Sequence, residues 1–183
     1  MEYFATLKDK DIFPNKTFPE IQEWAERKTV KIILENEQGK IALVTNPVHK
    51  CHLLPGGGID EGEDVISAGD RECREEVKYS IDGAKEIGII EEYRARDGKH
   101  YETYGLIANA KDPISEDLRT DDEKKNELTV EWHSPMDVLA LFEAQEKRLK
   151  DGEIDFYNTG FNIVRDKLFF NRAIGAGHIT LGS

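Results

Sequence analysis

Three glutamates, Glu72, Glu75 and Glu76, are spaced so that they can act together. Residues at positions i, i+3 and i+4 share one face of an α-helix, so the three carboxylates would lie close to one another. Like charges in this arrangement destabilise an exposed helix by roughly 0.2–0.5 kcal/mol per pair. Arg71 can form an ion pair with Glu75, but one cation cannot neutralise three anions. The cluster is therefore either a solvated acidic face or a site for cations.

A glycine-rich loop precedes this helix, in which Pro55 is followed by Gly56, Gly57 and Gly58. Glycine adopts backbone conformations that are closed to other residues, and it lets another group approach the chain closely. A loop that offers backbone carbonyls beside a helix that offers carboxylates would make an all-oxygen site. Such a site suits hard cations, Mg²⁺ or Mn²⁺ among them.

Other glycine-rich and metal-binding patterns fit the sequence poorly. The three glycines lack the spacing of a dinucleotide-binding loop, and neither a phosphate-binding loop nor an EF-hand is present. The two cysteines do not form a CxxC pair, and the five histidines lie too far apart in sequence for a zinc signature such as H-E-x-x-H. We therefore expect no histidine metal site.

The composition excludes several classes of protein. A net charge of −12 argues against nucleic-acid binding, which requires clustered Lys and Arg. No apolar run approaches the roughly 18–20 residues that a membrane span needs. The first residues, MEYFATLKDKDIF, lack the pattern of a signal peptide, so we expect a cytoplasmic protein. The sequence leaves homodimer formation open.

The stretch from Gly57 to Tyr79 resembles the signature of Nudix hydrolases, G-x5-E-x7-R-E-U-x-E-E-x-G-U, in which U is apolar. The matching residues are Gly57, Glu63, Arg71, Glu72, Cys73, Glu75 and Glu76. Lys78 departs from the signature, because glycine usually stands at that position. Lysine is strained in the left-handed conformation that commonly ends a helix, so we expect the chain to turn later, near Asp82-Gly83.

The resemblance implies a pyrophosphohydrolase that depends on Mg²⁺ or Mn²⁺ and cleaves a nucleoside diphosphate linked to another moiety, such as a nucleotide or a sugar. It implies metal ligation by Glu75, Glu76 and the Gly56 carbonyl, and a role for Glu72 as metal ligand or general base. Arg71 and Glu63 would orient the loop and the helix, with Arg71 part of the catalytic machinery. Substrate would contact Gly57 and Gly58.

Two other classes of function stay open at this point. One is a Nudix-fold domain that binds nucleotides or regulates a partner without turnover, against which the complete set of glutamates argues. The other is an acidic calcium-binding module, which would need no glycine loop. No motif outside the signature identifies the substrate. Tyr101 or Tyr104 could stack on a base, although packing within a hairpin is the simpler interpretation.

A general base could come from beyond the signature. The polar stretch 111–127 contains Glu116, Glu123 and Glu127, and loops of this length are often functional. Glu127 is preferred because it immediately precedes the predicted strand LTVEW, which would hold it near the helix. A solvated glutamate is the alternative.

The elements that must position these residues follow from periodicity. We expect a single domain over residues 1–183, with an N-terminal extension (1–28), a core (29–176) and a tail (177–183). The pattern predicts hairpins over 29–46 and 86–110, the second with Asp97-Gly98 at its tip. Helices are predicted over 64–77, from Pro135 to residue 150, and over 161–174, with a strand at 128–134. This order indicates an α/β fold, an α/β/α sandwich with a mixed β-sheet between helices.

Overall fold

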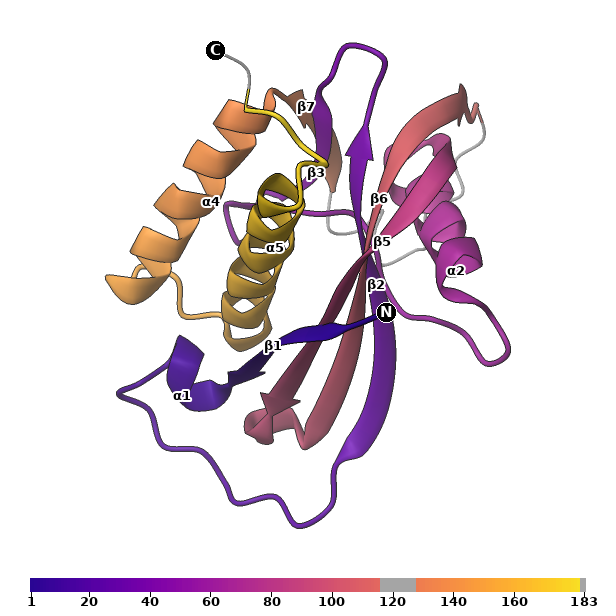
Figure 1. Ribbon diagram of the computed structural model, residues 1–183. Coiled ribbons are helices and arrows are strands. Elements are labelled where there is room, and N and C mark those ends of the chain that lie inside the picture. The colour runs from indigo at the N-terminus through magenta and orange to yellow at the C-terminus, as the bar shows by residue number, and fades with distance from the viewer. Residues whose placement is uncertain (116–127, 182–183) are drawn as a thin grey trace.

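The computed structural model of the protein describes residues 1–115 and 128–181 (Figure 1). Its strands are β1 (Tyr3–Lys8), β2 (Ala25–Glu35), β3 (Ile41–Asn46), β4 (Cys51–Leu53), β5 (Tyr79–Arg94), β6 (Lys99–Pro113) and β7 (Thr129–His133). Its helices are α1 (Asp9–Ile12), α2 (Val65–Glu72), α4 (Pro135–Lys150) and α5 (Tyr157–Gly175). A π-helical turn (Cys73–Val77) extends α2, and a 3-10 turn (Ala95–Asp97) follows β5.

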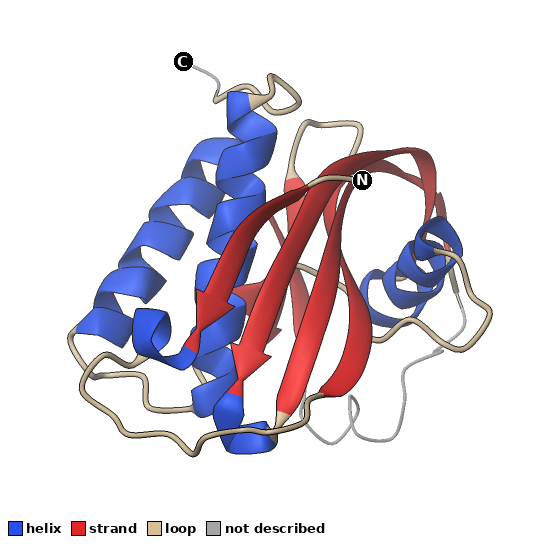
Figure 2. Cartoon of the chain, turned by 60° about the horizontal axis from the view of Figure 1, so that its bottom comes forward, coloured by secondary structure: helices blue, strands red, loops and turns tan. Residues whose placement is uncertain are grey.

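The strands form one seven-stranded mixed sheet in the order β1-β5-β6-β2-β3-β4, with β7 paired to β3. β1 runs parallel to β5 and β2 runs parallel to β6, whereas the other pairs are antiparallel. Helix α2 covers one face of the sheet, and α4 and α5 cover the other (Figure 2). The predicted α/β fold, with a mixed sheet between helices, is confirmed.

Two hydrophobic cores lie on the two faces of the sheet. Successive residues of a strand point to opposite faces, so Ile32 and Leu34 pack under α2 whereas Ile33 packs under α4 and α5. This is why the central strand reads as a nearly continuous apolar run. Among residues 1–115 and 128–181, no helix is long and apolar enough to cross a membrane.

The N-terminal segment is more closely integrated than the sequence predicted. β1 pairs in parallel with β5, Leu7 opposite Glu92, so residues expected to form an extension supply one strand of the sheet. β2 begins at Ala25 instead of residue 29.

The hairpin predictions are partly wrong. β5 and β6 do form a hairpin, but the 3-10 turn joins them and ends at Gly98, whose φ is 64°, in place of a two-residue turn. β2 and β3 pair only at Glu35 and Ile41, because the other edge of β2, away from β6, bonds to the glycine-rich loop, where the amides of Val30 and Ile32 donate to the loop carbonyls. Pairing between distant segments therefore overrides the local pairing that the sequence favours.

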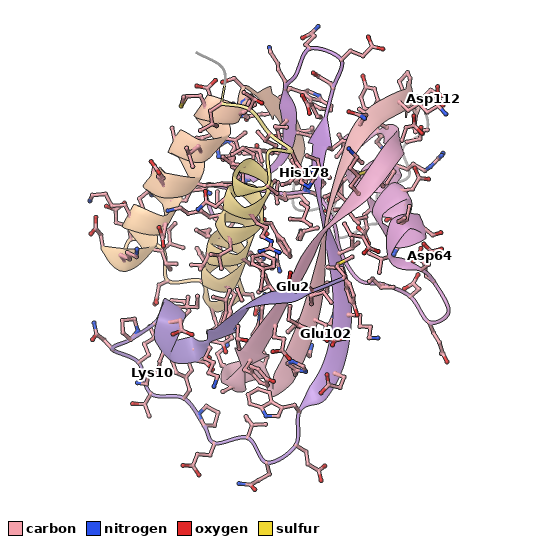
Figure 3. The ribbon with its side chains drawn as sticks, in the orientation of Figure 1. Glu2, Lys10, Asp64, Glu102, Asp112 and His178 are labelled. Atoms are coloured by element: carbon pink, nitrogen blue, oxygen red, sulfur yellow. The ribbon has the colours of Figure 1, made fainter. Side chains whose placement is uncertain are left out.

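The helix of the signature begins and ends differently from the prediction. Asp64, at the start of α2, caps the helix by accepting hydrogen bonds from the backbone of Ile66 and Ser67, both 3.0 Å (Figure 3). The predicted α-helix over 64–77 becomes a π-helical turn after Glu72. It then ends on Lys78 itself, in the left-handed conformation with φ 68° and ψ 32°. The prediction that the turn is deferred to Asp82-Gly83 is wrong.

Candidate active site

The glycine loop is held along β2 by backbone hydrogen bonds. The amide of Ile32 donates to the Pro55 carbonyl at 3.0 Å, and the amide of Val30 donates to the Gly57 carbonyl at 2.9 Å. Gly56 has a φ of 130°, and a Cβ there would lie 2.1 Å from the Val30 carbonyl oxygen. Only glycine fits this position, because any side chain would collide with the neighbouring backbone.

Two of the signature glutamates contact this loop directly. The amide of Gly56 donates a 2.7 Å hydrogen bond to Oε2 of Glu76. A Cβ at Gly57 would lie 2.5 Å from Oε1 of Glu72, so the glycine makes room for that carboxylate. The sequence spacing placed the loop and the helix together, and the structure shows the atoms through which they meet.

Arg71 connects the loop, the helix and the segment between them. Its guanidinium donates two 3.0 Å hydrogen bonds to Glu63, a bidentate pair, and a 2.7 Å bond to the Gly58 carbonyl. Its Nη1 atom also lies 2.8 Å from Oε1 of Glu72 and 3.5 Å from Oε2 of Glu75. The second contact is the predicted ion pair with Glu75. The hydrogen bonds with Glu63 raise the pKa of Arg71 further, so it is a permanent cation.

Glu72 is the most deeply placed of the three carboxylates, at 7% exposure. Burial raises the pKa of Glu72, and the hydrogen bond from Arg71 only partly opposes this. Glu75 and Glu76 are half-buried on the π-helical turn. π-helical turns occur often at functional sites, and here the turn carries two of the three glutamates.

A half-buried lysine that sequence analysis missed lies against the same loop. The Nζ atom of Lys31 donates to the carbonyl of Leu54 at 2.9 Å and to the carbonyl of Gly56 at 2.7 Å. Burial lowers the pKa of Lys31, while nearby Asp166 opposes the shift. The signal was a charged residue inside the apolar run TVKIIL, because a charge that is partly removed from water in a central strand requires partners.

A network of buried charges supports the loop from the other face of the sheet. Asp166 on α5 is fully buried, and it accepts a 2.8 Å hydrogen bond from the amide of Leu54. Arg165 pairs with Asp166 at 2.9 Å and with Glu92 at 3.3 Å, and Glu92 in turn accepts from Arg94 at 2.9 Å. The position of the loop therefore depends on the last helix as well as on the sheet.

An open pocket of about 500 Å³ adjoins the carboxylate cluster. Glu75, Arg71 and Arg74 line it from the helix, and Lys111 and Asp112 line it from β6. Asp112 is labelled in Figure 3. The volume of the pocket is within the range of small-molecule sites, roughly 300–1,000 Å³. Its three cationic side chains are balanced by the carboxylates of Asp70, Glu75 and Asp112, so an anionic ligand would need a bound cation as well.

Some predicted site residues lie elsewhere. Glu116, Glu123 and Glu127 fall outside the described residues. Tyr101 lies under the guanidinium of Arg94, 4.4 Å from ring centroid to Cζ, and the hydroxyl of Tyr104 donates to Glu102 at 3.2 Å. Neither tyrosine lines the pocket beside α2.

The arrangement fits a hard divalent cation. The carboxylates of Glu72 and Glu76 meet at the loop, and carboxylate oxygens are among the ligands that Mg²⁺ and Mn²⁺ prefer. The space at Gly57 that a Cβ would fill is taken up by the Glu72 carboxylate, so the loop is shaped around that group.

The fold and this site together define a mixed α/β protein with a glycine-lined, carboxylate-rich centre. The family model described as NUDIX domain matches residues 25–153, well over half of the chain. The chain belongs to the Nudix family and is a Nudix hydrolase.

Solved structures share the fold. A NUDIX hydrolase from Nitrosomonas europaea matches with a TM-score of 0.54 and 20% identity, covering 84% of this chain and 90% of that one. A structure described as an ADP compounds hydrolase matches with a TM-score of 0.54 and 22% identity, covering 85% of this chain and 76% of that one. At these identities the likeness shows the fold alone. Among curated proteins, no significant match to the sequence was found.

Proposed function

We propose that the protein is a pyrophosphohydrolase, dependent on Mg²⁺ or Mn²⁺, that cleaves a nucleoside diphosphate linked to another moiety. One observation carries the proposal: the carboxylates of Glu72 and Glu76 both lie against the Gly56-Gly57 backbone. Helix and loop thus converge on one cluster of oxygen donors.

The residues that would hold the cation are Glu75, Glu76 and the carbonyl of Gly56, with Glu72 as a further ligand or as the base. When bound, a divalent cation neutralises the diphosphate and acidifies water. In a protein with a net charge of −12, cationic groups are also what admits an anionic substrate. Arg71 holds the Gly58 carbonyl and Glu63 in place, which fixes the loop relative to the helix.

The general base must accept a proton, so its carboxyl group has to be ionised at the operating pH. The pKa of Glu72 is raised by burial, which brings it toward the operating pH that suits a base. Glu127 stays the second candidate, as a residue that approaches the site only when substrate and cations are bound.

Substrate phosphates would occupy the pocket beside α2, where the carboxylates of the lining offset its cations and a bound divalent cation would supply the net positive charge. Gly57 and Gly58 would contact the substrate through their backbone. The neighbour described as an ADP compounds hydrolase makes ADP-linked compounds the first to try. We further propose that the protein acts on small molecules in the cytoplasm; homodimer formation stays open.

The test is a substrate panel. Purified protein is incubated with ADP-linked compounds, nucleotide sugars, dinucleotides and nucleoside triphosphates, each with Mg²⁺ or Mn²⁺, and products are identified by mass spectrometry. We expect cleavage of a phosphoanhydride bond that stops when a chelator is added. A domain that only binds nucleotides would shift in thermal stability with one of these compounds and release no product.

A further inference from the structure

A second cluster of possible metal ligands lies outside the signature, and it contains two histidines. His52 on β4 and Glu131 and His133 on β7 each offer a ligand atom, and these atoms all lie within 4.8 Å of one another. The residues are 79 and 81 positions apart in sequence, so no local spacing could reveal them. The sequence-based expectation of no histidine metal site is therefore reopened.

The sheet brings the three side chains to one face. β3 lies between β4 and β7, with Thr45 opposite His52 and Leu43 opposite Glu131. Residues paired across antiparallel strands, and residues two apart on one strand, share a face.

The distances within the cluster are hydrogen-bond distances, and they also match the spacing of ligands around one small ion. Oε2 of Glu131 lies 3.3 Å from Nε2 of His52 and 3.0 Å from Nε2 of His133. Donors bonded at 2.0–2.1 Å in tetrahedral geometry are about 3.3 Å apart. Two imidazole nitrogens already converge on a single carboxylate oxygen, and the rings are at 86° to each other, so they do not block one another.

The cluster is accessible and is held from behind. The side chains of His52 and His133 are 21% and 23% exposed, so an ion can reach them from solvent. Gln145 on α4 accepts from the amide of His52 at 2.5 Å and donates to its carbonyl at 3.0 Å, which fixes the backbone that carries the first ligand. A ligand on a fixed backbone loses less entropy when it binds an ion.

We propose that His52, Glu131 and His133 form a second metal site, selective for Zn²⁺ or a similar late transition-metal ion. Imidazole nitrogen suits zinc, copper and nickel, whereas Mg²⁺ is held by oxygen alone. Three protein ligands leave one position for water. An ion here ties β4 to β7 across β3, and β4 leads within one residue to Leu54, the start of the glycine loop. The site clamps the strand that carries that loop.

Zinc affinity is the test, measured by competition with a chromophoric chelator in excess Mg²⁺, which fills the all-oxygen cluster. Wild-type protein is expected to bind one equivalent of Zn²⁺, and His52→Asn and His133→Asn to bind it at least tenfold more weakly. His178→Asn is the matched control, because His178 is exposed and lies outside the cluster. Zn²⁺ should also raise the Tm of wild type and of the control, but of neither ligand variant.

Two results would overturn the proposal. One is wild-type protein that takes up no Zn²⁺ in excess Mg²⁺, and the other is equal Zn²⁺ affinity in wild type and the His52→Asn/His133→Asn double variant. X-ray absorption on the wild-type zinc complex decides the matter without any variant, since the proposal requires scattering from two imidazoles. Neither readout depends on hydrolysis, so the outcome is independent of the proposed activity.

Discussion

The amine of Lys31 donates a 2.7 Å hydrogen bond to the carbonyl of Gly56, the backbone oxygen proposed as a metal ligand. A side-chain cation therefore already lies at the oxygen where a metal ion would bind. The same amine holds the Leu54 carbonyl, and the neighbouring charges of Glu76 and Glu72 favour its protonated form.

Replacement of Lys31 by Met is expected to tighten the binding of Mn²⁺ by roughly tenfold. A positive charge a few ångströms from a cation repels it by several kcal/mol at an effective dielectric near 20, before screening. The loop should keep its place without Lys31, because Ile32, Val30 and Asp166 also hold it. Isothermal titration measures the affinity, with Lys31→Arg as the control that keeps the charge. Weaker binding by Lys31→Met would show that Lys31 matters more for loop position than for charge.

Lys78 allows the left-handed end of the signature helix to be tested by a matched pair of variants. Lys78→Gly and Lys78→Ala both remove the side chain and its interactions, so they differ only in backbone freedom. We expect the glycine variant to be more stable by about 1 kcal/mol, because alanine is strained at a φ of 68°. Urea unfolding measures the difference, and kcat should stay within twofold of wild type. Equal stabilities would mean that Lys78 leaves this conformation in solution.

Glu92 gives the stability of the protein a predictable pH dependence. Burial alone would raise the pKa of Glu92, but Arg165 and Arg94 outweigh burial and hold it below its usual value. A carboxylate with a lowered pKa stabilises the fold above about pH 4.5, and this contribution is lost as the pH falls through the folded-state pKa.

Glu92→Gln should therefore cost about 3 kcal/mol at pH 7, because two buried arginines lose a charged partner. The difference from wild type should narrow as the pH is lowered from about 4.5 toward 3. Urea unfolding at a series of pH values measures it, with exposed Glu37→Gln as the control. A difference in unfolding free energy that stays constant across this pH range would contradict a lowered pKa of Glu92.

Glu127 and Glu72 are the two candidates for the general base, and the activity of a Glu127 variant decides between them. If Glu127 is the base, Glu127→Gln should lose kcat by roughly 10² to 10⁴, and Glu123→Gln should not. Metal affinity should change little in either variant. A wild-type kcat in Glu127→Gln would assign the role to Glu72, whose raised pKa already suits it.

The parts of the site that lie close together in sequence were predictable. Helical spacing places Glu72, Glu75 and Glu76 together, and the consecutive glycines indicate a loop that other groups can approach. These signals are local, because all the residues that they involve lie within residues 56–76. The mixed sheet followed from the order of the predicted strands and helices.

The parts that the sequence could not predict depend on distant contacts. Asp166 accepts a hydrogen bond from the amide of Leu54, which is 112 residues away in sequence. No periodicity links the two residues. The glycine loop likewise takes the edge of β2 that a local hairpin with β3 would have used. The prediction at Lys78 was wrong for a different reason. Lysine is disfavoured in a left-handed conformation, but the packing of the helix and of β5 on either side of Lys78 outweighs this preference.

The most direct test of the proposed function is the rate of hydrolysis of the best substrate from the panel, measured against Mg²⁺ concentration in wild type and Glu76→Gln. Glu61→Gln is the matched control, since Glu61 is an exposed glutamate of the same segment. Removing Glu76 takes away a proposed ligand and the partner of the Gly56 amide, so activity should fall by roughly 10² or more while the control stays at the wild-type rate. Wild-type turnover in excess chelator, or an unchanged rate in Glu76→Gln, would contradict the account.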